Sequence, residues 1–260
     1  MCATQINVEK QGFVATLTIS NPEKRNALDK ESWNKLSHAL ARLDGDKSLR
    51  CIVIRGEGTN AFAAGADISE FPELRSNAQQ AKDYGDVVAM ALETLQNCRH
   101  PTVAMIHGAC TGGGLEIACC CDMRIAGQSA RLGIPIKRIG NALAPPEMKP
   151  SLDLLGPAVV LEMLLEGQLF GGDDAVQRGL VNRVVPDDEL AENVYATADR
   201  IAEGAPLAAQ MTKKTLKRLG NPEPLSEQEL IDSYAACNSD DYAEGIRSFL
   251  AKEKPQFKGQ

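Results

Sequence analysis

Apolar residues in the first sixty positions follow two periods, one typical of strands and one typical of helices. The segment "INVEKQGFVATLTIS" (6–20) alternates apolar and polar residues around Gln11-Gly12, which predicts a β-hairpin. Asp29 stands where a helix N-cap is expected, and Trp33 and Leu40 fall on one face of the helical pattern that follows. The apolar run "RCIVIRGEG" (50–58) ends in glycines, which is typical of a buried parallel strand.

A similar order of elements occurs in the next seventy residues. Residues 78–98 form a helical pattern, and residues 102–106 are a second buried strand that leads through glycines into a helix beginning near Gly113. The segment "DMRIAG" (122–127) predicts one more short strand. The expected apolar stripe of the 78–98 helix consists of Val87, Met90, Ala91, Leu92 and Leu95.

The second half of the chain is mainly helical in pattern. Residues 157–167 predict a helix, and "DDAVQRGLVNRVV" (173–185) predicts a helix followed by a strand. Helical patterns at 187–204, 206–219 and 226–254 continue almost to the end. Strands and helices that alternate, followed by helices alone, indicate the α/β class with a helical C-terminal region.

The composition of the chain argues against some classes of function but does not identify one. The chain has 260 residues, 43% of them apolar and 24% charged, with a net charge of −7, so no general basic surface for nucleic acid is expected. The N-terminus has no basic segment followed by an apolar run, and no stretch approaches 18 uninterrupted apolar residues. We therefore expect a cytoplasmic protein without membrane contact, whose eight cysteines are reduced.

Two glycine turns can direct backbone amides toward one ligand. The stretch "GACTGGGLEIACCC" (108–121) places Gly112 and Gly113 at the start of a helix, where backbone N–H groups have no intrahelical partner. In "AAGAD" (63–67), Gly65 permits a tight turn that exposes the N–H of Ala66. Two such amides facing one point would stabilise an oxyanion, and loss of one donor typically costs roughly 10²–10³ in rate.

Glu116 is the single acidic residue in this apolar stretch. It lies three residues beyond Gly113, one turn into the predicted helix and on the same face. A helix N-terminus stabilises the carboxylate, whereas apolar surroundings raise its pKa, so the group suits proton transfer near neutral pH. The alternative is that Glu116 only completes the first turn of the helix.

Other kinds of site have weaker support. His107, Cys110 and Cys119–Cys121 contain no C-x₂-C pair, so buried packing of the thiols is a better interpretation than a metal site, and we expect none. Neither a dinucleotide-binding nor a phosphate-loop motif is present at Gly112–Gly114. A lysine-bearing RNA-binding helix is disfavoured because residues 29–47 intersperse acids with the bases.

Four segments together resemble the crotonase superfamily, the enoyl-CoA hydratase/isomerase group. "NPEKRNAL" (21–28) resembles its first coenzyme A loop, and "FAAGADISEF" (62–71) resembles the segment with one oxyanion amide. "IHGACTGGGLEIACCCDMRIA" (106–126) is similar to the second oxyanion turn and its acidic residue. "GLVNRVVPDDEL" (179–190) and "FLAKEKPQFKG" (249–259) look like the trimerisation region and the C-terminal tail.

The resemblance implies a ββα spiral core over residues 1–190, which holds a coenzyme A thioester site, and a helical oligomerisation region over residues 191–260. It assigns the oxyanion amides to Ala66 and Gly113 and the acid/base role to Glu116, with no cofactor beyond the coenzyme A of the substrate. It implies a homotrimer or a hexamer made of two trimers. The residues that it places around the substrate are Lys24, Arg25, Ala64, Asp67, Ile68, Gly112, Ile136, Phe249 and Lys252, the last two serving the nucleotide of the same or a neighbouring subunit.

One position departs from the family pattern. Hydratases of the family have a proline–glutamate pair about twenty residues after the first glutamate, and the matching pair here is Pro135-Ile136. Isoleucine can neither hold a water nor transfer a proton. Glu147, in the proline-rich segment "NALAPPEMKP" (141–150) that we expect to be a loop, and Glu162 on the next helix are candidate replacements.

Two hypotheses of function follow. The first is an enzyme of the enoyl-CoA hydratase/isomerase type that stabilises a thioester enolate and uses Glu116 as acid/base, either for hydration or for a shift of a double bond. The second is a coenzyme A thioester-binding homologue with little or no hydratase activity, because Ile136 replaces the second glutamate. The identity of the acyl group is open.

Overall fold

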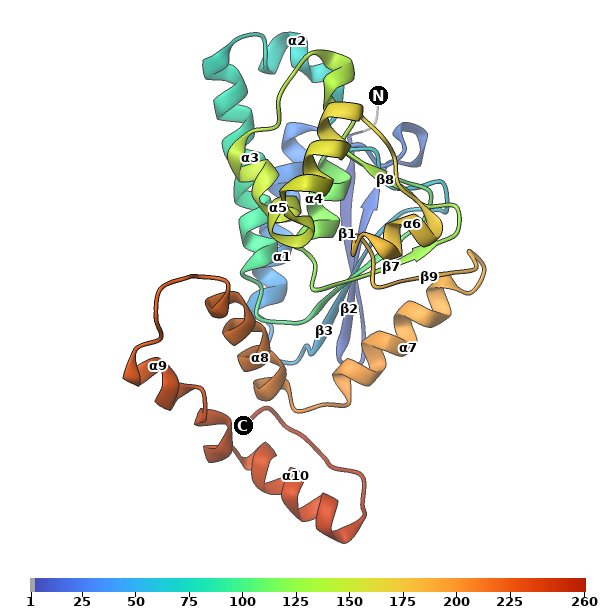
Figure 1. Ribbon diagram of the computed structural model, residues 1–260. Helices are drawn as coiled ribbons and strands as arrows, with labels where there is room; N and C mark the ends of the chain where they lie inside the picture. The colour runs from blue at the N-terminus through green and yellow to red at the C-terminus, as the bar shows by residue number, and fades with distance from the viewer. Residues whose placement is uncertain (1–2) are drawn as a thin grey trace.

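A computed structural model describes residues 3–260, and residues 5–185 build two sheets that share a repeating unit (Figure 1). The larger sheet has six strands in the order β1-β2-β3-β5-β7-β9, with β1 and β2 antiparallel and the other neighbours parallel. Its strands are β1 Gln5–Gln11, β2 Val14–Ser20, β3 Cys51–Gly56, β5 Thr102–Ile106, β7 Met123–Gly127 and β9 Arg183–Val185. The hairpin and the strands predicted at 50–58, 102–106 and 122–127 are confirmed.

A second, smaller sheet was not predicted from the sequence. Its three parallel strands, β4 Ala61–Ala63, β6 Ala109–Thr111 and β8 Arg131–Gly133, have three residues each, too few to show a period of two. In each repeat the chain runs through one strand of the large sheet, one strand of the small sheet and then a helix. This arrangement confirms the α/β class and the ββα spiral.

Helices cover both faces of the large sheet. Alternate residues of β3 point to opposite faces: Ile52 and Ile54 join the larger core with α1 and α3, whereas Cys51 and Val53 pack against α7. The helices of the core are α1 Lys30–Gly45, α2 Phe71–Leu74, α3 Ala78–Gln96, α4 Gly113–Cys120, α5 Pro145–Leu161, α6 Gly172–Gln177 and α7 Leu190–Ala202. The predicted N-cap is confirmed, because the Asp29 side chain accepts a hydrogen bond from the Ser32 amide at the start of α1.

Three expectations for helices were wrong in part. Met90 is exposed, because the buried stripe of α3 is made by Tyr84, Val88, Ala91, Leu92 and Leu95. The segment 141–150 is a loop only as far as Ala144, where α5 begins at Pro145 and then bends at Gly156. The long helix predicted at 226–254 is interrupted between α9 (Glu227–Asp232) and α10 (Asp240–Ala251), which Ser239 caps anew.

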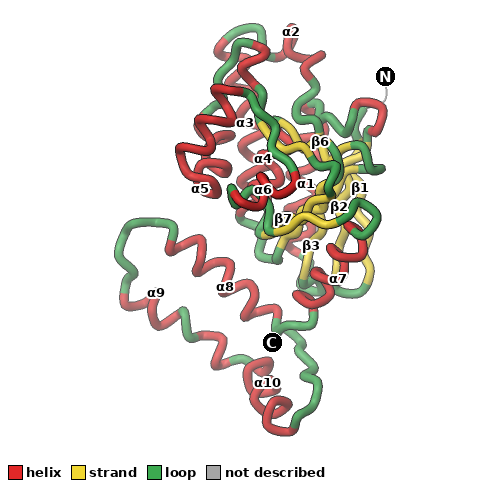
Figure 2. Tube along the Cα trace, turned by 45° about the vertical axis from the view of Figure 1, so that its right-hand side comes forward, coloured by secondary structure: helices red, strands yellow, loops and turns green. Residues whose placement is uncertain are grey.

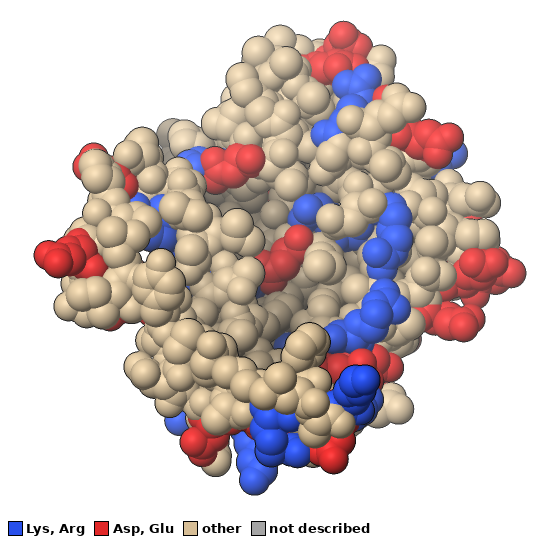
Figure 3. Space-filling model, turned by 60° about the horizontal axis from the view of Figure 1, so that its bottom comes forward, with Lys and Arg blue, Asp and Glu red and all other residues tan. Residues whose placement is uncertain are grey.

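The C-terminal helices α8 (Pro206–Leu219), α9 and α10 extend away from the sheets (Figures 1 and 2). Helix α8 is held to the core by Lys213, whose ammonium donates to the carbonyl of His100 and pairs with Asp122. Acidic and basic side chains alternate over this end of the molecule, with several basic ones beside a hollow (Figure 3). Since α7 packs on the sheet, the predicted boundary at residue 190 lies before the last core helix, and the division into two domains stays a prediction.

Candidate active site

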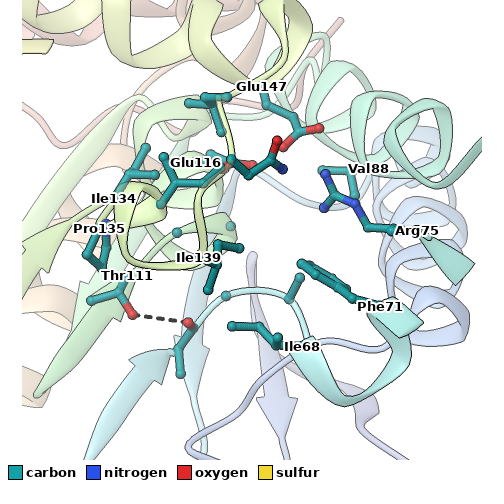
Figure 4. A pocket seen from close by; sticks show the side chains of 18 of the residues that line it. Ile68, Phe71, Arg75, Val88, Thr111, Glu116, Ile134, Pro135, Ile139 and Glu147 are labelled. Carbon is teal, nitrogen blue, oxygen red and sulfur yellow. Dashed lines mark hydrogen bonds between the residues drawn. The ribbon is translucent and has the colours of Figure 1, made fainter. Parts of the chain in front are cut away.

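The two glycine turns and the start of α5 enclose a mostly apolar cavity of about 130 Å³ (Figure 4). Apolar side chains such as Phe71, Val88 and Leu143 form much of its wall. Seven of the residues that the family resemblance assigns to the site line it together: Ala64, Ala66, Ile68, Gly112, Gly113, Glu116 and Ile136. The cavity lies where the small sheet ends, because β4 leads into the first turn and β6 into the second.

The glycine turns lie against each other so closely that larger residues would not fit. Gly65 has a φ of +101°, and a Cβ placed on it would lie 3.1 Å from the amide nitrogen of Gly113. A Cβ on Gly113 would lie 3.7 Å from the amide nitrogen of Ala66 and only 2.6 Å from the Trp33 ring. The amides of Ala66 and Gly113 are therefore close neighbours across the two turns.

Hydrogen bonds fix both turns but leave these two amides free. Leu28 N–H donates to the carbonyl of Gly65 at 2.8 Å, and the Thr111 hydroxyl donates to the carbonyl of Ala64 at 3.0 Å (Figure 4). Gly112 N–H donates to Gly133. Within residues 3–260, no backbone hydrogen bond uses the amide of Ala66 or of Gly113. Both remain able to donate to a ligand in the cavity.

Glu116 faces this cavity from the first turn of α4, where every residue of the helix is buried. The residue is only 3% exposed. Burial raises the pKa of its carboxyl group well above the usual range, the neighbouring charge of Glu147 raises it further, and Arg75 opposes the shift. The neutral, protonated form of the group is therefore favoured more than in a solvent-exposed carboxyl.

A second carboxyl group, Glu147, enters the same cavity from the first turn of α5 (Figure 4). It is 6% exposed, and among the described residues its Oε1 has no hydrogen-bond partner. Burial raises its pKa too, while the charge of Arg75 lowers it. Of the two candidate replacements, Glu162 is elsewhere: it pairs with Arg178 at 2.6 Å and does not line the cavity.

Arg75 completes the charged part of the cavity and was not predicted from the sequence. It follows the short helix α2, and its guanidinium lies 4.5 Å from the ring centroid of Phe71 and 5.2 Å from that of Tyr84. Arg75 belongs to none of the ion pairs within residues 3–260. Its charge is shared between the two aromatic faces and the two carboxyl groups.

The sequence profile of the enoyl-CoA hydratase/isomerase family matches residues 9–260. A probable enoyl-CoA hydratase of Bacillus subtilis is 36% identical over 98% of this chain and 99% of its own, and a crotonyl-CoA hydratase of Syntrophomonas wolfei is 30% identical over 99% of both. The crystal structure of an enoyl-CoA hydratase/carnithine racemase from Magnetospirillum magneticum is similar, with 45% identity and a TM-score of 0.96 over 98% of this chain and 96% of that one. The chain belongs to the enoyl-CoA hydratase/isomerase family.

In this family member, Ile136 occupies the wall of the cavity where the family pattern has a glutamate. It begins a short 3₁₀ helix, Ile136–Ile139, and packs against the core. The chain then turns at Gly140, so that α5 approaches the cavity again and supplies Glu147. The cavity thus has an isoleucine at position 136 and a carboxyl group that comes from α5.

The expected coenzyme A loop lies next to the first glycine turn. Arg25 accepts a backbone hydrogen bond from Ala64 at 3.0 Å, and the ammonium group of Lys24 pairs with Asp67. Burial would raise the pKa of Asp67, but hydrogen bonds from Lys24 and Ser69 hold it below its usual range. None of these three side chains lines the cavity itself, so their role toward coenzyme A stays a prediction.

Phe249 and Lys252, on and just after α10, are not part of this cavity. Phe249 is 84% exposed. Helix α10 lies at the opposite end of the molecule from the glycine turns (Figure 1), so the role of these residues toward the nucleotide stays a prediction.

All described cysteines except the exposed Cys237 are buried in this fold. Cys110 and Cys119 to Cys121 are buried, as expected, and burial raises the pKa of each thiol. Within residues 3–260, no group of three or more His, Cys, Asp or Glu residues is arranged to hold a metal ion. No helix in the same range is both long and apolar enough to cross a membrane.

Proposed function

We propose that this protein binds an acyl-CoA thioester and catalyses the reversible addition of water to a 2-enoyl-CoA. The amides of Ala66 and Gly113 would hold the thioester oxygen, and Glu116 would transfer a proton at the carbon next to the carbonyl. The observation that carries the proposal is a buried carboxyl group in the same cavity as two adjacent, unpaired backbone amides. The similarity to the two bacterial hydratases supports the same reaction class.

The physical argument concerns the enolate. Addition at the β carbon moves electrons onto the thioester oxygen, and two oriented N–H groups stabilise that charge without reorganisation of solvent. Apolar walls around the cavity strengthen this interaction by lowering the local dielectric constant. The chemistry uses protein groups, water and the thioester, and it requires no cofactor because coenzyme A is part of the substrate.

A second candidate function is thioester binding without hydration. Ile136 favours it, because that side chain cannot act on water at the position where the family pattern has its second glutamate. Under this alternative, Glu147 would be a buried but inactive carboxyl group.

Incubation with a panel of enoyl-CoA and saturated acyl-CoA thioesters in D₂O, followed by mass spectrometry, tests both candidates. We expect hydrated product and deuterium next to the thioester carbonyl from the parent protein, and strong loss of both from Glu116→Gln with acyl-CoA affinity retained. Binding by calorimetry with neither exchange nor hydration would select the binding homologue. A shifted double bond without water uptake would instead assign an isomerase.

We infer further that the protein assembles as a homotrimer, alone or as two trimers in a hexamer. The C-terminal helices expose a set of large apolar side chains that a second copy of the chain would cover: Leu216, Leu219, Leu230, Ile231, Ile246, Phe249 and Leu250. Assembly would also bring Phe249 and Lys252 toward a neighbour's nucleotide. Light scattering that gives a monomer at micromolar concentration would contradict this.

A further inference from the structure

We propose that Glu147 is the second proton-transfer group of this site, the base that activates water in place of the residue missing at position 136. This inference rests on the proposed function, since it concerns the water that is added. It assigns to α5 a catalytic residue that the family pattern places on the preceding loop.

The position of the Glu147 side chain is the first argument. Glu147 is 6% exposed, lines the cavity together with Glu116, and has an oxygen without a hydrogen-bond partner among residues 3–260. An unsatisfied buried carboxyl group costs folding free energy, and such groups concentrate at functional sites. A bound water or substrate in the cavity would supply the missing partner.

A purely structural role explains less. Glu147 stands in the first turn of α5, where a capping box would use its side chain, but Ala144 at the N-cap has no side-chain oxygen and no capping hydrogen bond is formed. Pro145 and Pro146 lack the amide hydrogens that a carboxylate could accept from. The Glu147 carboxyl group is therefore not needed to start the helix.

The second argument is the charge balance of the cavity. Glu116 and Glu147 interact with each other, and both interact with Arg75, which has no other ion pair within residues 3–260. One proton held by the pair leaves one negative charge opposite the single positive charge of Arg75. The pair then contains an acid and a base at the same time, as water addition requires.

The step balances with water as co-reactant. Glu147 as carboxylate accepts a proton from water while the water oxygen forms a bond to the β carbon. The π electrons of the double bond move to the thioester oxygen, where Ala66 and Gly113 stabilise the enolate. Neutral Glu116 then donates its proton to the α carbon, the carbonyl re-forms, and a proton that passes from Glu147 to Glu116 restores the pair.

Two reactions separate the inference from the proposed function. Deuterium exchange into butanoyl-CoA needs only enolate formation, whereas hydration of crotonyl-CoA also needs a base for water. We expect Glu147→Gln to lower kcat for hydration at least about 100-fold while exchange stays within several-fold of the parent, the range expected for loss of one proton-transfer group. Glu116→Gln should lower both rates. Glu162→Gln is the matched control outside the cavity and should change neither.

Hydration by Glu147→Gln at the parent's rate would overturn the inference and leave the proposed function intact. Equal loss of hydration and exchange in that variant, with crotonyl-CoA affinity retained, would indicate a structural role and would overturn it as well. A parent protein that does not hydrate crotonyl-CoA or longer 2-enoyl-CoAs removes the proposed function and the inference together. If Glu147→Gln does not fold, the pH profile of kcat/KM for hydration by the parent protein decides. A bell-shaped profile supports a pair of carboxyl groups that act as acid and base, and a profile with only one titration overturns the inference.

Discussion

The carboxyl groups of Glu116 and Glu147 lie in one apolar cavity although they come from two different helices, and the charge of Glu147 raises the pKa of Glu116. Helix α4 positions the first beside the paired glycine turns, and the proline-initiated helix α5 brings in the second. Arg75 reaches the same charges from the end of α2 and lowers the pKa of both. The site therefore combines two acids and one positive charge inside a mostly apolar wall.

Replacement of Glu116 by Gln should raise the stability of the protein and lower its activity. The pKa of Glu116 is raised in the folded protein, so the fold tolerates the neutral carboxyl group at low pH. Folding stability therefore falls as the pH rises from about 4.5, the pKa of the group in the unfolded chain, toward its pKa in the folded protein. Glu116→Gln removes that cost, so we expect a higher Tm than the parent at pH 8 and a smaller difference at pH 5. Each kcal/mol added to the free energy of unfolding raises Tm by about 2–4 °C in a chain of this size.

Thermal unfolding at the two pH values, followed by circular dichroism, checks this expectation. Exposed Glu73→Gln is the control and should show no such dependence on pH. A Glu116→Gln protein less stable than the parent at pH 8 would show that the carboxylate is stabilised in the fold, contrary to the burial argument.

Loss of the charge at Arg75 should shift the pH dependence of activity. Arg75 lowers the pKa of both carboxyl groups, so Arg75→Gln should raise both pKa values. The part of the pH profile of kcat/KM in which the base loses its proton should then move toward higher pH. We expect about a 10-fold lower kcat/KM at pH 7, because one pKa unit corresponds to a tenfold change in the population of the reactive form. Arg75→Lys, which keeps the charge, should restore most of the parent's profile; an unchanged profile in Arg75→Gln would exclude the electrostatic role.

The oxyanion geometry can be tested at Gly113 without changing any charge. A Cβ at Gly113 would lie 2.6 Å from the Trp33 ring, so Gly113→Ala must displace the turn and its amide. We expect a loss of roughly 10²–10³ in kcat, the usual effect of removing one oxyanion donor. Gly45→Ala is the control, since an added Cβ there contacts nothing within 4 Å. A Gly113→Ala protein with the parent's kcat would show that this amide does not hold the substrate.

Regular patterns in the sequence predicted much of the fold, and irregular ones did not. The hairpin, the buried strands and the capped helix α1 were predicted because each spans enough residues to show a period. The strands of the small sheet are three residues long, and their place depends on parallel pairing with distant segments. Helix α5 did have a local signal, Pro145 at its first position followed by an acidic first turn.

For the site, local motifs predicted the amides and Glu116, while the charge network depends on tertiary structure. Gly113 and Glu116 are close in sequence, so one helical turn relates them. Arg75 lies about forty residues before Glu116 and about seventy before Glu147 and follows a helix of four residues, so no spacing rule relates it to the cavity. Glu147 reaches the cavity because the chain turns at Gly140 before α5 begins, and the sequence also offered Glu162 as a candidate.

Restoring the family pattern at position 136 offers a direct test of the exchange between loop and helix. Ile136 lines the cavity, so Ile136→Glu in the Glu147→Gln background would keep two carboxyl groups there, one of them at the position that the family pattern uses. We expect this double variant to hydrate crotonyl-CoA at least about 10-fold faster than Glu147→Gln alone, part of the 10²–10⁴-fold that a proton-transfer group contributes. Ile136→Gln in the same background matches the size and polarity without the proton and should give no recovery. Equal recovery by both would mean that polarity at 136, rather than proton transfer, limits the reaction.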